Sequence, residues 1–181
     1  MLLYLHGFAS CGDSNKTRLL KRLFGEKSVL APDLPVAPDA AVAYIDSLIK
    51  SGDVSALAGS SLGGFYATWF SEKCRLPAVL LNPSVAPWIT LKPYVGINTF
   101  WCSGEPFEWR REYPDQLKAY RCERLSETRK LVLLQTGDEV LDYRIAEAFY
   151  AQCSVVTEKG GSHRFENLDD YLETVEDFIR S

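Results

Sequence analysis

The sequence predicts a single α/β domain, residues 1–181, built on a parallel sheet of about six strands with helices on both faces. Short apolar runs alternate with longer amphipathic stretches, which is typical of consecutive β-α-β units. Several of the apolar runs contain no polar position, as expected of strands that helices cover on both sides. A length of 181 residues fits one domain with a sizeable core.

The expected strands are apolar runs of three to five residues. In chain order they are Leu2–Leu5, Val29–Ala31, Val54–Ala58, Ala78–Leu81, Leu131–Gln135 and Ser154–Thr157. Since parallel strands joined by helices make right-handed crossovers, this succession predicts the sheet order 2-1-3-4-5-6.

The expected helices lie between these strands and carry apolar residues at helical spacing. They cover Asn15–Phe24, Asp39–Lys50, Leu62–Lys73, Tyr143–Ala151 and Leu168–Ile179. Asp39 follows a proline at the start of the second helix, and we expect its side chain to cap that helix.

Residues 83–128 interrupt this alternation. They contain five prolines and three of the four tryptophans, and they are far longer than an ordinary strand-to-helix connection. We expect an inserted loop or a small cap over one end of the sheet. Its aromatic residues either fill the core or line an acyl site, and Trp88, Trp101 and Trp109 are the candidates for substrate binding.

Composition excludes several classes of protein. The net charge of −4 lacks the basic footprint of a nucleic-acid-binding protein, and no apolar run is long enough to span a membrane. The first residues lack the basic region and length of a signal peptide. Five widely spaced cysteines without a Cys-x-x-Cys pair indicate reduced thiols rather than disulfides or a zinc site. A cytoplasmic protein without a metal or an organic cofactor is therefore expected.

The strongest local motif is Gly-Ser-Ser-Leu-Gly at residues 59–63, after an expected strand and before an expected helix. This context is typical of a nucleophile elbow, in which a sharp turn presents a serine hydroxyl above the sheet. Only Ser61 has a glycine two residues before it and another two residues after it. The alternative interpretation is a glycine-rich turn with surface serines.

A serine hydroxyl needs a base to become a nucleophile at neutral pH. The chain has only two histidines, His6 and His163. His163 follows two glycines between the last strand and the last helix, where a tight loop can bring it to the carboxyl edge of the sheet, so we expect it to be the base. His6 is expected to shape its own loop, and a solvated loop histidine is the alternative for His163.

A carboxylate should orient that histidine, and three candidates follow the strand at 131–135. Asp138 comes directly after the turn at the strand's end and is the preferred one. Asp142 is expected to cap the next helix, and Glu139 ranks below both. The chain order is then Ser61, Asp138, His163.

Acyl transfer also requires donors for a developing oxyanion. The backbone N–H of Leu62, directly after the nucleophile, is the first expected donor. The second is the N–H of Phe8, which follows a His-Gly pair at the end of the first strand.

These motifs resemble the α/β-hydrolase superfamily and, more closely, the small bacterial YqiA-type esterases. The resemblance rests on residues 4–8, 59–69, 80–83, 136–144 and 160–163, in the right order along nearly the whole chain. It implies a minimal α/β-hydrolase fold and activity on simple acyl esters or thioesters. Residues 83–128 match less clearly.

The function expected from the sequence is a serine esterase with a small-molecule acyl ester or thioester as substrate. The small size of the domain favours short acyl chains, around four carbons. An acyl thioesterase on the same triad, lactone hydrolysis or perhydrolysis, and a non-enzymatic binding protein on a hydrolase scaffold are the alternatives.

Overall fold

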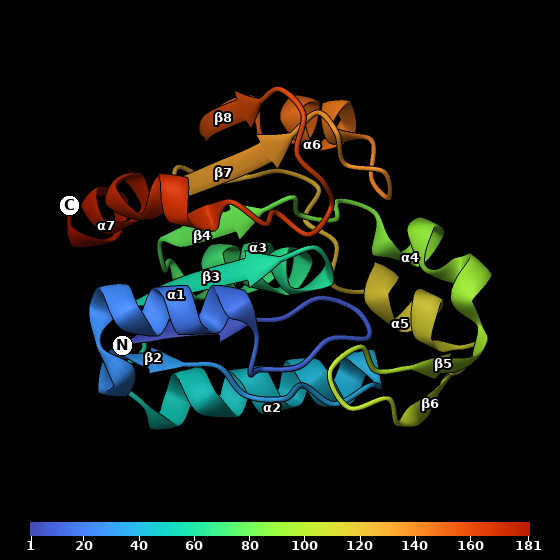
Figure 1. The fold of residues 1–181 in the computed structure, drawn as a ribbon. Coiled ribbons are helices and arrows are strands. Elements are labelled where there is room, and N and C mark those ends of the chain that lie inside the picture. Colours follow the sequence, from blue (N-terminus) through green and yellow to red (C-terminus); the bar gives the residue numbers. More distant parts are fainter.

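The central sheet has six parallel strands in a computed structural model that describes residues 1–181. Their order is β2-β1-β3-β4-β7-β8, and every neighbouring pair is parallel (Figure 1). The bounds are β1 Leu2–Leu5, β2 Val29–Leu30, β3 Ala56–Ser60, β4 Ala78–Leu81, β7 Lys130–Gln135 and β8 Ser154–Glu158. This is the order expected from the sequence, so the predicted topology is confirmed.

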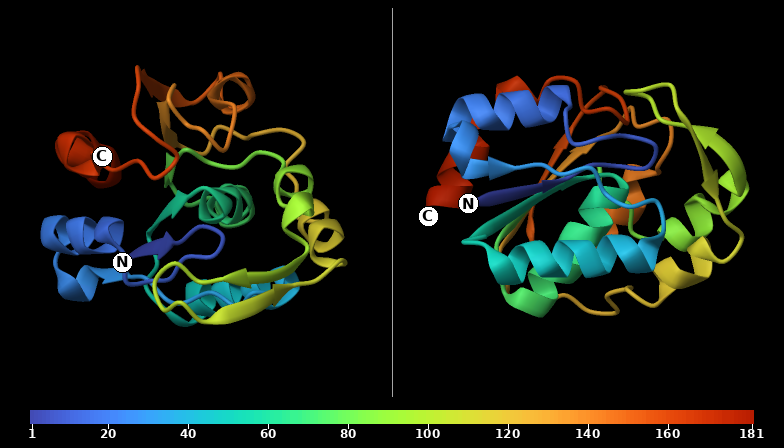
Figure 2. Two further views of the ribbon diagram at one scale, coloured as in Figure 1. Left: turned by 45° about the vertical axis from the view of Figure 1, so that its right-hand side comes forward. Right: turned by 90° about the horizontal axis from the view of Figure 1, so that it is seen from below.

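Five longer helices cover the two faces of the sheet (Figure 2, left). On one face lie α1 (Asn15–Phe24) and α7 (Leu172–Arg180), the latter preceded by the short 3₁₀ helix η3 (Leu168–Tyr171). On the other lie α2 (Pro38–Ser51), α3 (Leu62–Cys74) and α6 (Tyr143–Phe149). A further 3₁₀ turn, η1 (Glu26–Ser28), precedes β2. No helix combines the length and the apolar character that a membrane crossing requires.

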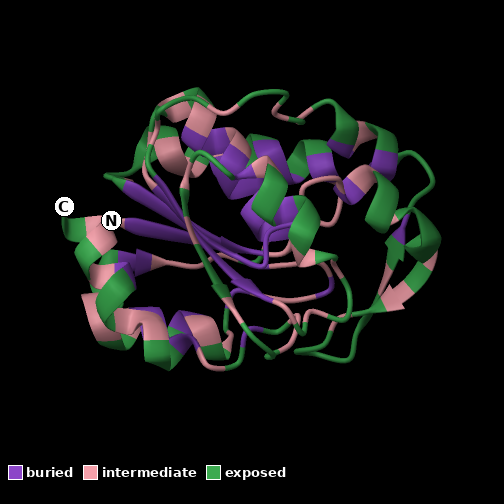
Figure 3. Cartoon of the chain, turned by 90° about the horizontal axis from the view of Figure 1, so that it is seen from above, coloured by how far each residue is buried: buried purple, intermediate pink, exposed green.

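The alternation of side chains along each strand divides the core in two. In β1, Leu2 and Tyr4 pack with residues of α1 and α7, whereas Leu3 and Leu5 pack with residues of α2, α3 and α6. The strands of the sheet centre are buried along their whole length, and the exposed residues lie on the outer sides of the helices (Figure 3). Helices on both faces explain why polar residues in these strands occur only at strand ends, as with Ser60, Lys130 and Gln135.

Most bounds of helices and strands differ from expectation by one or two residues, and the expected helix Leu168–Ile179 divides into η3 and α7. Asp39 does not cap α2, which begins one residue earlier at Pro38 without a side-chain cap; its carboxylate accepts a hydrogen bond from the Tyr120 hydroxyl instead. Strand β3 lies two residues later than expected, at Ala56–Ser60, and therefore runs directly up to Ser61.

Residues 83–118 form a small layer at the carboxyl ends of the strands (Figure 1, right), and residues 119–128 lead back to the start of β7. The layer contains α4 (Pro87–Thr90), the 3₁₀ turn η2 (Lys92–Tyr94), strands β5 (Gly96–Thr99) and β6 (Pro106–Trp109), and α5 (Tyr113–Lys118). Strands β5 and β6 form an antiparallel hairpin that is separate from the main sheet. The sequence pattern predicted an insertion here but not the hairpin.

Candidate active site

Ser61 occupies a strained turn between β3 and α3. Its φ of 55° and ψ of −118° lie where a non-glycine residue is rarely found, and such strain persists only when neighbouring structure enforces it. The flanking glycines are part of that structure. A Cβ added to Gly59 would lie 2.3 Å from the Gly63 carbonyl oxygen, and one added to Gly63 would lie 1.9 Å from the Leu5 oxygen. Both positions therefore require glycine.

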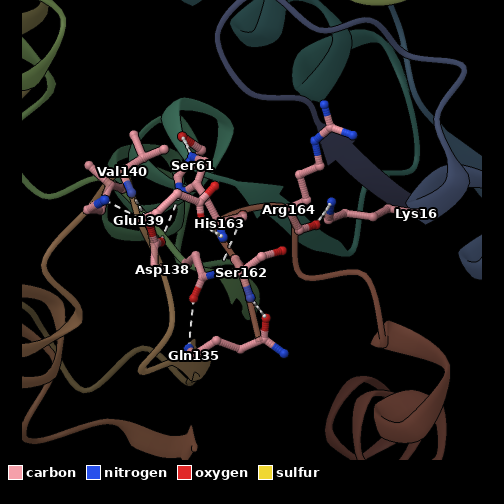
Figure 4. Close-up of polar contacts among 11 residues, drawn as sticks. Lys16, Ser61, Gln135, Asp138, Glu139, Val140, Ser162, His163 and Arg164 are labelled. Carbon is pink, nitrogen blue, oxygen red and sulfur yellow. Dashed lines mark hydrogen bonds and ion pairs between the residues drawn. The ribbon is translucent and has the colours of Figure 1, made fainter. Parts of the chain in front are cut away.

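The three residues expected to form a triad lie in hydrogen-bond contact (Figure 4). The Oγ of Ser61 is 2.9 Å from Nε2 of His163, and Nδ1 of His163 is 2.8 Å from Oδ2 of Asp138. Ser61 comes from the β3–α3 turn, Asp138 from the loop after β7 and His163 from the loop after β8. Residues separated by up to 102 positions thus meet at the carboxyl edge of the sheet.

The Asp138 carboxylate is fixed on both oxygens. Oδ2 faces His163, and Oδ1 accepts hydrogen bonds from the N–H groups of Val140 at 2.9 Å and Leu141 at 2.7 Å. Its side chain is only 2% exposed, against 18% for His163. Asp142 instead caps α6 by accepting from the Arg144 N–H, as expected from the sequence.

Glu139 has a contact that the sequence did not indicate. Its Oε2 accepts a hydrogen bond from the backbone N–H of His163 at 3.0 Å, and this bond lowers the pKa of Glu139 below its ordinary value. The carboxylate is exposed to solvent. It therefore contributes to the position of the histidine loop without belonging to the hydrogen-bonded triad.

Two backbone N–H groups beside Ser61 have no acceptor within the protein. They belong to Leu62, at the first position of α3, and to Phe8, in the loop after β1; both residues line the same cavity as Ser61. The β1 loop runs close to the serine, because a Cβ added to Gly7 would lie 3.2 Å from the Cβ of Ser61. Unpaired donors of this kind can stabilise a developing negative charge.

His6 is built into the framework of that loop. Its Nε2 accepts a hydrogen bond from the Leu34 N–H at 2.9 Å, and its Nδ1 lies 2.9 Å from the Gly7 carbonyl oxygen. Burial lowers the pKa of His6 below its ordinary value, which favours the neutral ring that this pairing requires. The structural role expected for His6 matches these contacts.

A cavity of about 590 Å³ opens above Ser61 and His163. One wall comes from the loops at the sheet edge and the other from residues 83–128. The second wall is lined by Thr90, Leu91, Tyr94, Asn98, Thr99, Phe100, Trp101 and Gly104. The two walls are joined where the Trp101 N–H donates to the Ala9 carbonyl oxygen at 2.9 Å and where the Arg164 guanidinium lies 5.5 Å from the Trp101 ring.

The three tryptophans considered for substrate binding have different surroundings. Trp101 lines the cavity and is 76% exposed. Trp109 is 1% exposed and packs edge-on against Phe8, and Trp88 packs against Phe65; neither of them lines this cavity. Trp101 is thus the one whose position is compatible with substrate contact.

The arrangement can support nucleophilic acyl transfer, since it combines a hydroxyl, an adjacent imidazole, an orienting carboxylate and free N–H donors at a cavity. No group of three or more His, Cys, Asp and Glu side chains is placed to hold a metal ion. The sequence did not single out Leu91, Tyr94 and Asn98 of the cavity wall, because they lie in the segment whose fold it did not predict.

Comparison with known proteins agrees with this architecture. A family model described as the uncharacterised protein family UPF0227 matches residues 1–180. A UPF0227 protein of Serratia proteamaculans is 26% identical over 188 residues, which cover 98% of each chain.

Solved structures extend the likeness in fold. Est1E from Butyrivibrio proteoclasticus has a TM-score of 0.79 at 19% identity, over 98% of this chain and 86% of that one. A monoacylglycerol lipase of Paleococcus ferrophilus has a TM-score of 0.73 at 15% identity, over 98% and 93%. The α/β-hydrolase fold expected from the sequence is confirmed.

Proposed function

The chain belongs to the uncharacterised protein family UPF0227, and from that premise we propose that it is a serine hydrolase that cleaves carboxylic esters. The observation that carries the proposal is the hydrogen-bonded series Ser61–His163–Asp138 at a cavity with two unpaired N–H groups. A merely structural glycine turn would not require a strained serine aimed at a histidine.

The proposed reaction begins when the Ser61 oxygen attacks the acyl carbon of the ester and His163 Nε2 takes the hydroxyl proton. Asp138 holds the Nδ1–H of His163 and stabilises the imidazolium. The N–H groups of Leu62 and Phe8 stabilise the negative oxygen of the tetrahedral intermediate. His163 then gives its proton to the leaving alcohol. A water molecule, deprotonated by the same histidine, attacks the acyl carbon, and His163 returns that proton to the Ser61 oxygen as the acid leaves.

The names of similar proteins add support for an ester substrate. The structural neighbour from Paleococcus ferrophilus is a monoacylglycerol lipase, an enzyme named for hydrolysing an ester of glycerol. For the cellular location, we propose the cytoplasm, where the five unpaired cysteines would remain reduced.

Substitution of Ser61 tests the proposed function. Ser61→Ala should lower kcat/KM for a nitrophenyl ester by about 10⁴-fold or more, because the nucleophile is removed. Ser60→Ala is the matched control: this neighbouring hydroxyl has no contact with His163, and the variant should retain most of the activity. Equal activity of Ser61→Ala and the wild-type protein would refute the proposal.

For the acyl group, we propose a preference for short chains of around four carbons. The support is that the segment 83–128, which supplies one wall, contains five prolines and is tied to Ala9 through the Trp101 N–H. The cavity of about 590 Å³ itself falls in the range that holds drug-sized ligands. Measurement of kcat/KM for nitrophenyl esters from acetate to palmitate tests this. Since each buried methylene contributes about 0.8 kcal/mol, a long pocket would give a steep rise with length. A maximum at twelve carbons or beyond would contradict the preference and indicate a long-chain acyl thioesterase.

A further inference from the structure

The loop that carries His163 has no regular structure to fix it. Residues 159–167 connect β8 to η3, and Gly160 and Gly161 both have positive φ values, 86° and 73°. A loop with two such glycines has a wide choice of backbone conformations. The position of the imidazole must therefore be set by contacts made elsewhere in the molecule.

Two buried amide side chains hold the residue directly before His163. The backbone N–H of Ser162 donates to Oε1 of Gln135 at 2.9 Å (Figure 4). The backbone oxygen of Ser162 accepts from Nδ2 of Asn82 at 3.0 Å, and the same Nδ2 lies 3.4 Å from the His163 oxygen. Both backbone hydrogen-bonding groups of Ser162 are thus held by side chains from neighbouring strand ends, and its oxygen also accepts from the Phe165 N–H at 3.0 Å.

Asn82 is itself rigidly placed at the end of β4. It is 2% exposed, and its φ of 40° lies in the left-handed region that asparagine tolerates better than most residues. Its N–H donates to the Leu133 oxygen at 2.9 Å, and its Oδ1 accepts from the Gln135 N–H at 2.9 Å. Asn82 therefore connects β4, β7 and the histidine loop through four polar contacts.

The chemistry of the amide suits this position. Oδ1 must accept from a strand N–H while Nδ2 donates to the loop carbonyls, and among ordinary side chains of this size only an asparagine amide offers both. A buried donor or acceptor left unpaired here would destabilise the folded chain. The contacts consequently favour one position of the loop over others.

We propose that Asn82 is a positioning residue for the hydrolysis assigned above: acting with Gln135, it fixes the Ser162–His163 backbone so that the imidazole reaches both Ser61 and Asp138. Asn82 touches none of the reacting atoms. It acts only through the position of the histidine loop. Because misplacement of a reacting group by about 1 Å can cost 10²-fold in rate, loss of this side chain should lower kcat rather than raise KM. This inference rests on the proposed function.

Two substitutions of Asn82 separate the role of its side-chain hydrogen bonds from the role of its left-handed backbone conformation. Asn82→Gly permits the positive φ and removes the contacts of Nδ2 and Oδ1. Asn82→Asp keeps the shape and the acceptor but places a carboxylate oxygen against the carbonyl oxygens of Ser162 and His163. Val175→Ala is the control for lost stability, because Val175 is fully buried in α7 and packs in the core cluster on the opposite face of the sheet from α3.

The first measurement is steady-state hydrolysis of a short nitrophenyl ester together with the Tm of each variant. Both Asn82 variants should lose about 10- to 100-fold in kcat, the range found for residues that orient catalytic groups, with KM changed less than twofold. Val175→Ala should lower Tm and leave kcat at 25 °C unchanged. Wild-type kcat in both Asn82 variants would overturn the inference, as would an equal loss of kcat in Val175→Ala.

The second measurement needs no substrate, so its outcome is separable from the proposed function. The ring nitrogens of the two histidines give two sets of NMR signals, which His163→Ala assigns. In Asn82→Gly the His163 signals should shift while those of His6 stay in place. Unchanged His163 signals would overturn the positioning role even in a protein that hydrolyses esters, whereas a shift in a protein without esterase activity would contradict only the proposed function.

Discussion

The two walls of the cavity are built differently. The loops after β1, β3 and β7 follow strands that are buried along their whole length, whereas the loop with His163 follows the mostly exposed edge strand β8. Each of these loops places one polar group beside Ser61 or its triad partners. The wall from residues 83–128 rests on a two-stranded hairpin whose residues are mostly half-buried or exposed. It offers Leu91 and three aromatic side chains beside the small polar side chains of serine, threonine and asparagine. We therefore propose that the sheet edge carries out the hydrolysis and that the inserted segment selects the acyl group.

The largest difference in activity is expected between two carboxylate variants in the loop after β7, at the sheet edge. Asp138→Asn should depress kcat by about 10²–10⁴-fold, because an amide cannot hold His163 in the required tautomer. Asp142→Asn, four residues away, should keep its activity and lose at most about 1 kcal/mol of stability as an altered helix cap. The reverse ranking, measured on one ester, would move the acid from Asp138 to Asp142.

Within the inserted segment, one tryptophan lines the cavity and another packs in the core, so substitutions of the two should have different effects. Trp109→Ala should lower the free energy of unfolding by about 3–5 kcal/mol, because the ring is 1% exposed. Trp101→Ala should change that free energy by no more than about 0.5 kcal/mol, yet raise KM several-fold with kcat retained. Urea unfolding and ester kinetics on both variants measure this. An unchanged KM for every ester in Trp101→Ala would show that the exposed tryptophan does not contact substrate.

The smallest effect is expected at Glu139, on the solvent side of the histidine loop. The folded state lowers its pKa, so its bond to the His163 N–H stabilises the protein above the ordinary value of 4.5 and is lost as pH falls through the lowered pKa. Glu139→Ala should therefore have a slightly lower Tm than wild type at pH 7, and the difference should disappear in acid. The exposed Glu127 makes no hydrogen bond or ion pair, so Glu127→Ala is the control. A difference that grows in acid would contradict the contact.

The sheet could be predicted because its signals are local. Apolar runs mark the strands, the glycines at 59 and 63 leave one register for the nucleophile, and only two histidines compete for the base. The hairpin could not be predicted in the same way. Its second strand begins with Pro106, which argues against a strand, and a loop of six residues joins the two strands without a two-residue turn signal.

The contacts of Asn82 and Gln135 could not be predicted from the sequence either. Each residue stands at a strand end, where polar side chains are common, and nothing in the local pattern shows that both reach Ser162. They meet because β4 and β7 are neighbours and the loop after β8 folds back over them, which is a property of the assembled sheet. The hydrogen bond between Asp39 and Tyr120 could not be predicted for the same reason, because the two residues are 81 positions apart in the chain.

Covalent labelling shows whether Ser61 is the nucleophile of this fold without relying on the choice of an ester substrate. The wild-type protein is treated with a serine-reactive fluorophosphonate, and the modified peptide is located by mass spectrometry, with Ser61→Ala and His163→Ala in parallel. We predict one adduct on Ser61 in the wild-type protein, none in Ser61→Ala and much slower labelling in His163→Ala. An adduct on another serine, or equal labelling of Ser61→Ala, would contradict the account.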